Sequence, residues 1–169
     1  MKSHFTMFAR YNAWANTRLY DASATLPDAQ YRENAGAFFG SLHNTLNHLL
    51  LGDRIWMRRF TGSGDHPDRL DAILFDAFDA LRAARMEEDR RITSFVDGLG
   101  DADLSGTFKY RTISQPADIE QPLAPALAHF FNHQTHHRGQ AHTLLTRLTG
   151  TAPSFDLILF QRETGIGLG

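Results

Sequence analysis

Hydrophobic residues recur along most of the chain at steps of three and four positions, which is the repeat of an amphipathic helix. The pattern predicts four long helices, covering residues 3–24, 36–60, 69–99 and 122–149. Pro27, Gly98 and Gly150 stand where three of these helices should end, because proline and glycine interrupt or terminate helices. Four amphipathic helices in a chain of 169 residues predict an all-α fold, namely a four-helix bundle formed as a single domain over residues 1–169.

The segments between these helices have different patterns. The run TGSGDHPD at 61–68 is typical of a loop. The run TFKYRTISQ at 107–115 alternates and is rich in β-branched and aromatic residues, so it predicts a short β or irregular connection before the last long helix. A short apolar stretch at 155–160 is compatible with a final helix or with an extended cover.

Large aromatic and charged residues also occupy the predicted apolar stripes. Phe38, Trp56 and Phe130 are predicted core residues. Glu88 is the polar member of the third stripe, and Asp53 falls inside the second. A carboxylate at such a position needs a partner. Asp53 could bind a metal ion, support a ligand imidazole, or form a buried ion pair with an arginine.

Composition narrows the classes of function. The net charge is −2 and no basic run occurs, so a nucleic-acid partner is not expected. The absence of cysteine excludes disulfides, thiolate metal ligands and a cysteine nucleophile. The first residues, MKSHFTMFARYNAW, contain no apolar leader, and no window is apolar enough for a membrane span. We therefore expect a cytoplasmic protein without a membrane partner.

Histidines are concentrated in the last predicted long helix. Residues 129–142, HFFNHQTHHRGQAH, contain five of the nine histidines in the chain. At 100° per residue, His133 and His137 lie one turn apart and border the apolar face. Two imidazoles at this spacing can reach one metal ion, as in zinc proteases. A third ligand would have to come from another helix, and His4, His43 and His48 all remain candidates. The same histidines could also form a solvated or partly buried structural cluster.

Four motifs resemble the DinB family of four-helix bundles. The most specific is NHQTHHRGQAHTLL, and the others are YNAWANTRL at 11–19, LNHLLLGDRIWMRR at 46–59 and DLILFQRE at 156–163. The resemblance implies a DinB/YfiT-like bundle with up-down-down-up topology that frequently forms homodimers. It also implies that a metal ion is held by His48, His133 and His137, and it is this resemblance that selects His48.

Three imidazoles on one divalent ion leave positions open for substrate, as in catalytic sites, and imidazole suits zinc or nickel. The family is similar to a wider group that includes thiol-dependent transferases. We therefore expect a metal-dependent enzyme with a role in detoxification or stress response. Its substrates would be a low-molecular-weight thiol and a small electrophile. The alternatives are a hydrolase that uses bound hydroxide and a non-catalytic metal-binding protein.

Residues near the predicted site could act as a fourth ligand or support the three histidines. In the non-catalytic alternative a fourth ligand would fill the site, and His129, His136 and Asp53 are the first candidates. Arg138 is expected to pair with a carboxylate inside the bundle, and Gln140 to hydrogen-bond a ligand ring or a bound water. The sequence singles out no catalytic residue besides the metal ligands, so the general base stays unknown.

Overall fold

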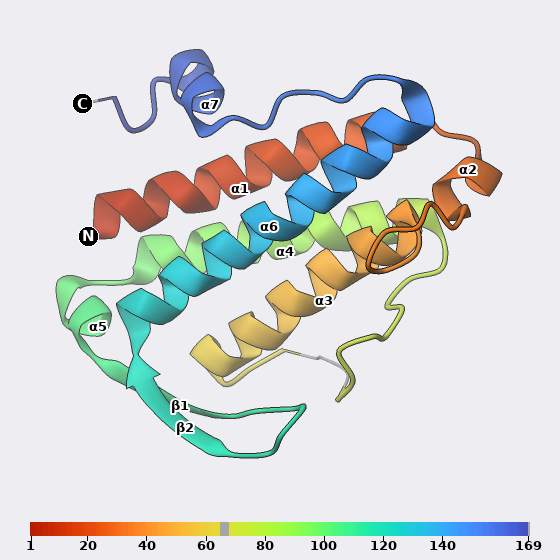
Figure 1. The fold of residues 1–169 in the computed structure, drawn as a ribbon. Coiled ribbons are helices and arrows are strands. Elements are labelled where there is room, and N and C mark those ends of the chain that lie inside the picture. Colours follow the sequence, from red (N-terminus) through yellow and green to blue (C-terminus); the bar gives the residue numbers. More distant parts are fainter. Residues whose placement is uncertain (65–67, 169) are drawn as a thin grey trace.

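The four predicted long helices form the body of the molecule (Figure 1). The computed structural model describes residues 1–64 and 68–168. The long helices are α1 (Lys2–Ser23), α3 (Leu42–Thr61), α4 (Phe78–Gly98) and α6 (Leu123–Thr149). Helices α1 and α6 run in one direction, and α3 and α4 run in the other (Figure 1). The predicted all-α bundle and its up-down-down-up order are therefore confirmed.

Shorter elements connect and cover the long helices. They are α2 (Asp28–Arg32), α5 (Asp101–Ser105), α7 (Leu157–Thr164), β1 (Thr107–Arg111) and β2 (Asp118–Pro122). The two strands form an antiparallel hairpin in which Tyr110 pairs with Ile119. The predicted β connection before the last long helix is confirmed, although its second strand begins only after the segment 107–115. The apolar stretch near the C-terminus is helical, and Phe160 of α7 is buried against Tyr11 and Trp14 of α1.

Helix α3 begins later than the predicted residue 36. The side chain of Ser41 accepts a hydrogen bond from the backbone N–H of Asn44 at 3.1 Å and caps the helix. Before it the chain makes a tight turn, closed by a hydrogen bond of 2.9 Å from Ala35 N–H to the carbonyl of Gly40. The side chain of Phe38 consequently points outward and is 84% exposed.

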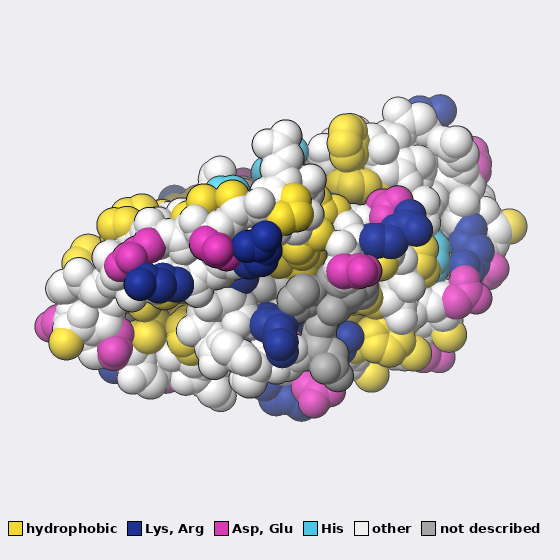
Figure 2. Space-filling view, turned by 90° about the horizontal axis from the view of Figure 1, so that it is seen from below, with side chains coloured by type: hydrophobic (Ala, Val, Ile, Leu, Met, Phe, Trp, Pro, Cys, Tyr) yellow, Lys and Arg dark blue, Asp and Glu magenta, His cyan; other side chains and the backbone are white. Residues whose placement is uncertain are grey.

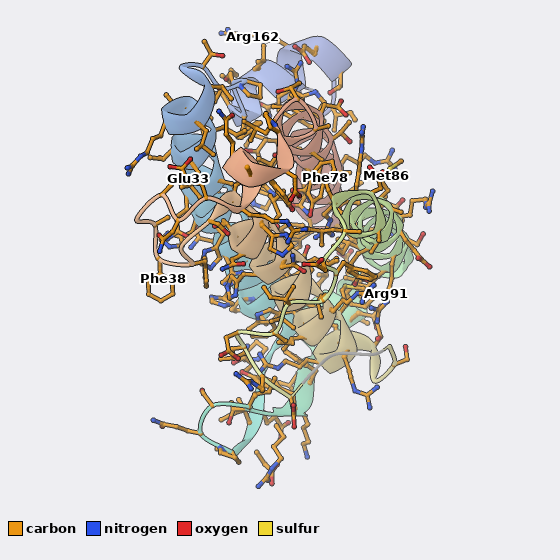
Figure 3. The ribbon with its side chains drawn as sticks, turned by 90° about the vertical axis from the view of Figure 1, so that its right-hand side faces the viewer. Glu33, Phe38, Phe78, Met86, Arg91 and Arg162 are labelled. Atoms are coloured by element: carbon orange, nitrogen blue, oxygen red, sulfur yellow. The ribbon has the colours of Figure 1, made fainter. Side chains whose placement is uncertain are left out.

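The core prediction is therefore wrong for Phe38, which projects from the bundle on the side opposite Met86 and Arg91 (Figure 3). The same prediction is confirmed for Phe130, which is buried, whereas Trp56 is half-buried.

Helix α4 begins nine residues after the predicted start, at Phe78 rather than residue 69. The reason is the buried side chain of Asn47 on α3. Its Oδ1 accepts the backbone N–H groups of Leu74 and Phe75 at 2.9 and 3.0 Å, and its Nδ2 donates to the carbonyl of Phe75 at 3.1 Å. These bonds replace the hydrogen bonds of a helix. The segment before α4 is consequently held against α3.

The predicted loop at 61–68 lies partly outside the described residues.

The surface has a mixed character. On the face shown in Figure 2, Lys and Arg side chains lie beside Asp and Glu side chains, with hydrophobic side chains reaching the surface between them. Within the described residues, no helix has the length and apolarity needed to cross a membrane.

Candidate metal centre

Three histidines from two helices come together on one side of the bundle. His48 lies on α3, whereas His133 and His137 lie one turn apart on α6. Each ring offers a nitrogen that lies within 4.8 Å of the nitrogens of the other two. The Nε2 atoms of His133 and His137 are 3.0 Å apart. The structure therefore brings together the three histidines that the resemblance selected.

Hydrogen bonds orient two of these rings. His48 Nδ1 lies 3.3 Å from the carbonyl oxygen of Leu70, and His137 Nδ1 lies 2.8 Å from Oε1 of Gln140. Both oxygens are acceptors, so the geometry assigns the ring proton to Nδ1 in each case. The Nε2 atoms of His48 and His137 then keep their lone pairs, which is the state that a metal ligand requires.

The third ring, that of His133, packs against the backbone of α3. A Cβ atom built on Gly52 would lie 2.9 Å from Cε1 of His133, closer than carbon atoms normally approach. Only glycine therefore leaves room for this ring at its observed position. Nδ1 of His133 is buried and has no hydrogen-bond partner among the described residues, so this side of the ring is positioned by packing, while Nε2 contacts His137 at 3.0 Å.

The environment keeps the three imidazoles neutral. Burial and the proximity of His137 lower the pKa of His48 to about 4. Burial and the neighbouring histidines lower the pKa of His133 to about 3. Burial also lowers the pKa of His137, although the hydrogen bond to Gln140 opposes this shift. Near neutral pH all three rings are therefore available as neutral donors.

The cluster opens into a cavity of about 630 Å³. His48 and His137 contribute to its lining together with Phe39 and the segment 70–73. The ring of Phe39 stacks on His48 with centroids 4.0 Å apart and planes at 25°. His48 and His137 are thus reached through a largely apolar opening, which is typical of a binding site for a small molecule.

The other histidines in the described part of the chain do not share this cluster. His43 packs edge-on against Tyr31 at 5.2 Å, and His4 packs against Phe8 near the N-terminus. His129 lies against Trp56, and His136 is exposed beside Gln140. Among the described residues the histidine cluster that could share one ion has three members. Neither His129 nor His136 therefore acts as a fourth ligand in this arrangement.

Of the three roles left open for Asp53, the structure supports the buried ion pair. Its Oδ2 accepts a hydrogen bond from Arg85 of α4 at 2.6 Å, and both side chains are buried. Its Oδ1 accepts from the amide of Gln134, the residue next to His133. Asp53 is therefore bonded to a neighbour of His133 in the bundle interior and is not a member of the histidine cluster.

The prediction for Arg138 is correct in location but not in partner. The side chain is buried inside the bundle, where it donates to the amide oxygen of Asn12 rather than to a carboxylate. Asn12 in turn donates to Asp89 at 3.5 Å. For Gln140, the predicted hydrogen bond to a ring of the histidine cluster is present, and its partner is His137.

Sequence analysis missed three contributors to the site: Phe39, Gly52 and the carbonyl group of Leu70. A glycine inside a strong helical pattern is a signal of close packing, and Gly52 could have been noticed on that basis. The other two contributors depend on how the segments before α3 and α4 fold back on α3, and the sequence pattern carries no sign of that.

The architecture defines a class of protein: a helical bundle with three imidazoles gathered at one open side. The DinB family model matches residues 1–167 of the chain. A relative, Protein DinB of Bacillus subtilis (strain 168), is 26% identical over 172 aligned positions, which cover 91% of this chain and 92% of the relative. The chain belongs to the DinB family.

Proposed function

We propose that the protein is a metal-dependent enzyme that holds one divalent ion, zinc or nickel, on His48, His133 and His137. The observation that carries the proposal is the convergence of three neutral imidazoles, two of which line an open cavity, with no fourth protein ligand among the described residues. Three imidazole donors and an open position are the donor set of catalytic metal sites, and nitrogen donors suit zinc and nickel.

The surrounding residues have supporting roles in this proposal. A bound divalent ion would act as a Lewis acid toward a thiol or a water molecule. Gln140 fixes the orientation of His137, and Leu70 fixes that of His48. Phe39 covers one face of the His48 ring and keeps water from it.

Within this class we favour transfer of a small thiol onto an electrophile. The chain has no cysteine, so the thiol would have to be a separate substrate. Asp71 is the carboxylate residue among those lining the cavity, and it is held by Arg69 at 2.8 Å. The described lining therefore offers no free carboxylate as a general base for hydrolysis by water, which favours a thiol over the hydrolytic alternative.

The proposal extends to the setting of the protein. The resemblance to the family favours a homodimer with a role in stress response or detoxification. The cysteine-free composition is compatible with a cytoplasmic location.

The first test is the metal content, by mass spectrometry, of protein purified without a His tag. We expect about one divalent ion per chain, lost in His48→Ala, His133→Ala and His137→Ala while circular dichroism shows a retained helical fold. His142→Ala on the same helix is the matched control, because His142 packs against Phe155 away from the cluster. Failure of the wild-type protein to bind zinc or nickel would refute the proposal.

The second test separates the thiol reaction from its alternatives. Cobalt-substituted protein should change its visible spectrum when a small thiol is added, because sulfur would enter the coordination sphere. Turnover of ester or amide substrates without added thiol would instead support the hydrolase. A spectrum that no thiol changes, together with a fully occupied coordination sphere, would support a non-catalytic metal-binding protein.

A further inference from the structure

The cavity above the histidines has exposed apolar walls. Seven large hydrophobic side chains are exposed in the described part of the chain, and three of them, Phe38, Leu70 and Ile73, line this one cavity. Their exposed fractions are 84%, 45% and 47%. Apolar side chains gathered around an opening are typical of a ligand-binding site, because a bound molecule removes their surface from water.

Hydrogen bonds to α3 hold the two segments of the chain on either side of the cavity. The side chain of Asn44 donates to the carbonyl of Phe39 at 2.8 Å and holds the turn before α3. Asn47 holds Leu74 and Phe75 on the other side. The turn that carries Phe38 and Phe39, and the segment that directly follows Ile73, are thus each tied to α3 by a side-chain amide.

The charge of the lining distinguishes this cavity from its neighbour. No lysine or arginine is among its described lining residues, and Asp71 is already paired with Arg69. A second hollow of similar size, beside the β-hairpin, is lined instead by Arg58, Arg59, Lys109 and Arg111. An anionic ligand would find cationic side chains there, whereas the described lining of the cavity above the histidines offers an anion no cationic side chain.

From these observations we infer that the cavity above His48 and His137 binds an uncharged, largely apolar small molecule. The molecule would contact the side chains of Phe38, Leu70 and Ile73. The inference rests on the proposed function, since it names the class of substrate presented to the same site. The volume of about 630 Å³ suits a molecule of one or two rings. The preference comes from two features together: apolar contact with the walls, and the lack of a lysine or arginine side chain in the described lining.

The test compares two probes of the same shape, 1-naphthalenemethanol and 1-naphthoate, by chemical-shift titration of the metal-free protein. We expect the neutral alcohol to bind at least tenfold more tightly than the carboxylate. Ile73→Ser and Phe38→Ser should each weaken alcohol binding by about three- to tenfold, because each removes tens of Å² of apolar contact. Ile158→Ser is the matched control, since Ile158 is 48% exposed on α7 and does not line the cavity.

Three results would overturn the inference: naphthoate binding as tight as alcohol binding, no saturable binding of the alcohol, or equal effects of Ile73→Ser and Ile158→Ser. Sedimentation tests the other occupant, a second copy of the chain. A dimer that Phe38→Ser dissociates, together with no alcohol binding, would make the cavity mouth a protein interface and refute the inference. Because the titration uses metal-free protein, its failure leaves the proposed metal chemistry standing. If the protein failed to take up metal, the proposed metal chemistry would be refuted. The titration would still show whether the cavity prefers an uncharged ligand.

Discussion

Two clusters of polar side chains lie within this bundle, one closed and one open. The closed cluster, here called the buried ionic network, consists of Asp53, Arg85, Asp89, Asn16 and Gln134. Arg85 bridges Asp53 and Asp89 at 2.6 and 2.9 Å, and Asn16 donates to Asp89 at 2.9 Å. The open cluster is the histidine trio, whose ring nitrogens lie close to one another and two of whose members, His48 and His137, line a cavity.

The difference between the clusters shows which one is suited to bind a ligand. In the buried ionic network opposite charges and amides face each other across four helices, so its interactions are made within the protein. The trio contains three groups of one kind, all neutral and all donors to a cation. In the proposed function an external ion would complete this cluster. Burial alone therefore does not distinguish a structural cluster from a binding site.

The largest expected effect comes from breaking the buried ionic network. Arg85→Met leaves two buried carboxylates without their cation, so the free energy of unfolding in urea should fall by about 3–5 kcal/mol. The zinc content of the folded fraction should stay near that of the wild type. The double variant Asp53→Asn/Arg85→Met should recover part of the loss. A loss below about 1 kcal/mol in the single variant would contradict the role assigned to the network.

Gly52→Ala perturbs the open cluster without touching a ligand. The added methyl group would meet His133 at 2.9 Å, and an overpacking cost of about 1–3 kcal/mol corresponds to zinc binding that is about 5- to 150-fold weaker. Competition with a chromophoric chelator measures this affinity. Gly139→Ala is the control, because its Cβ would meet nothing within 4 Å. Unchanged zinc affinity in Gly52→Ala would mean that the His133 ring is not confined by α3.

Gln140→Ala removes the acceptor that orients His137. Loss of such a supporting hydrogen bond typically weakens metal binding by about 10-fold or somewhat more, and we expect the lower end because Gln140 is only half-buried. Thr143→Ala, an exposed site further along α6, serves as the control. The same chelator competition measures the effect, and an unchanged dissociation constant would exclude Gln140 from supporting the site.

The smallest expected effect concerns His43, the buried histidine outside both clusters. Burial lowers its pKa and Arg32 lowers it further, whereas Asp76 and Asp28 oppose the shift. The unfolded chain therefore binds a proton below pH 6.5 more readily than the folded chain does, so this residue makes stability fall as pH decreases. Urea denaturation of metal-free wild type and His43→Gln at pH 7 and pH 5 should show a smaller loss in the variant. An equal loss in both would show that His43 titrates alike in the folded and unfolded states.

The ends of a helix could be predicted from the sequence where neighbouring residues determine them. They could not be predicted where the side chain of a residue far along the chain determines them. Helix α6 was predicted within a residue because proline and glycine mark its ends. Helices α3 and α4 were predicted to start too early, because apolar spacing also continues through segments that Ser41 and Asn47 hold out of the helix. The side chain of Asn47 acts across 27 and 28 residues, and no local pattern records such a contact.

For the candidate site, the sequence by itself determined the donors and their spacing. His133 and His137 lie one turn apart because the helical repeat places them there, and the motif resemblance added His48. Only the tertiary structure decided the rest: the Gly52 backbone against the third ring, the Leu70 carbonyl on His48, and the apolar cavity above them. Helical periodicity is a property of neighbouring residues, whereas packing distance and burial arise only when separate helices come into contact.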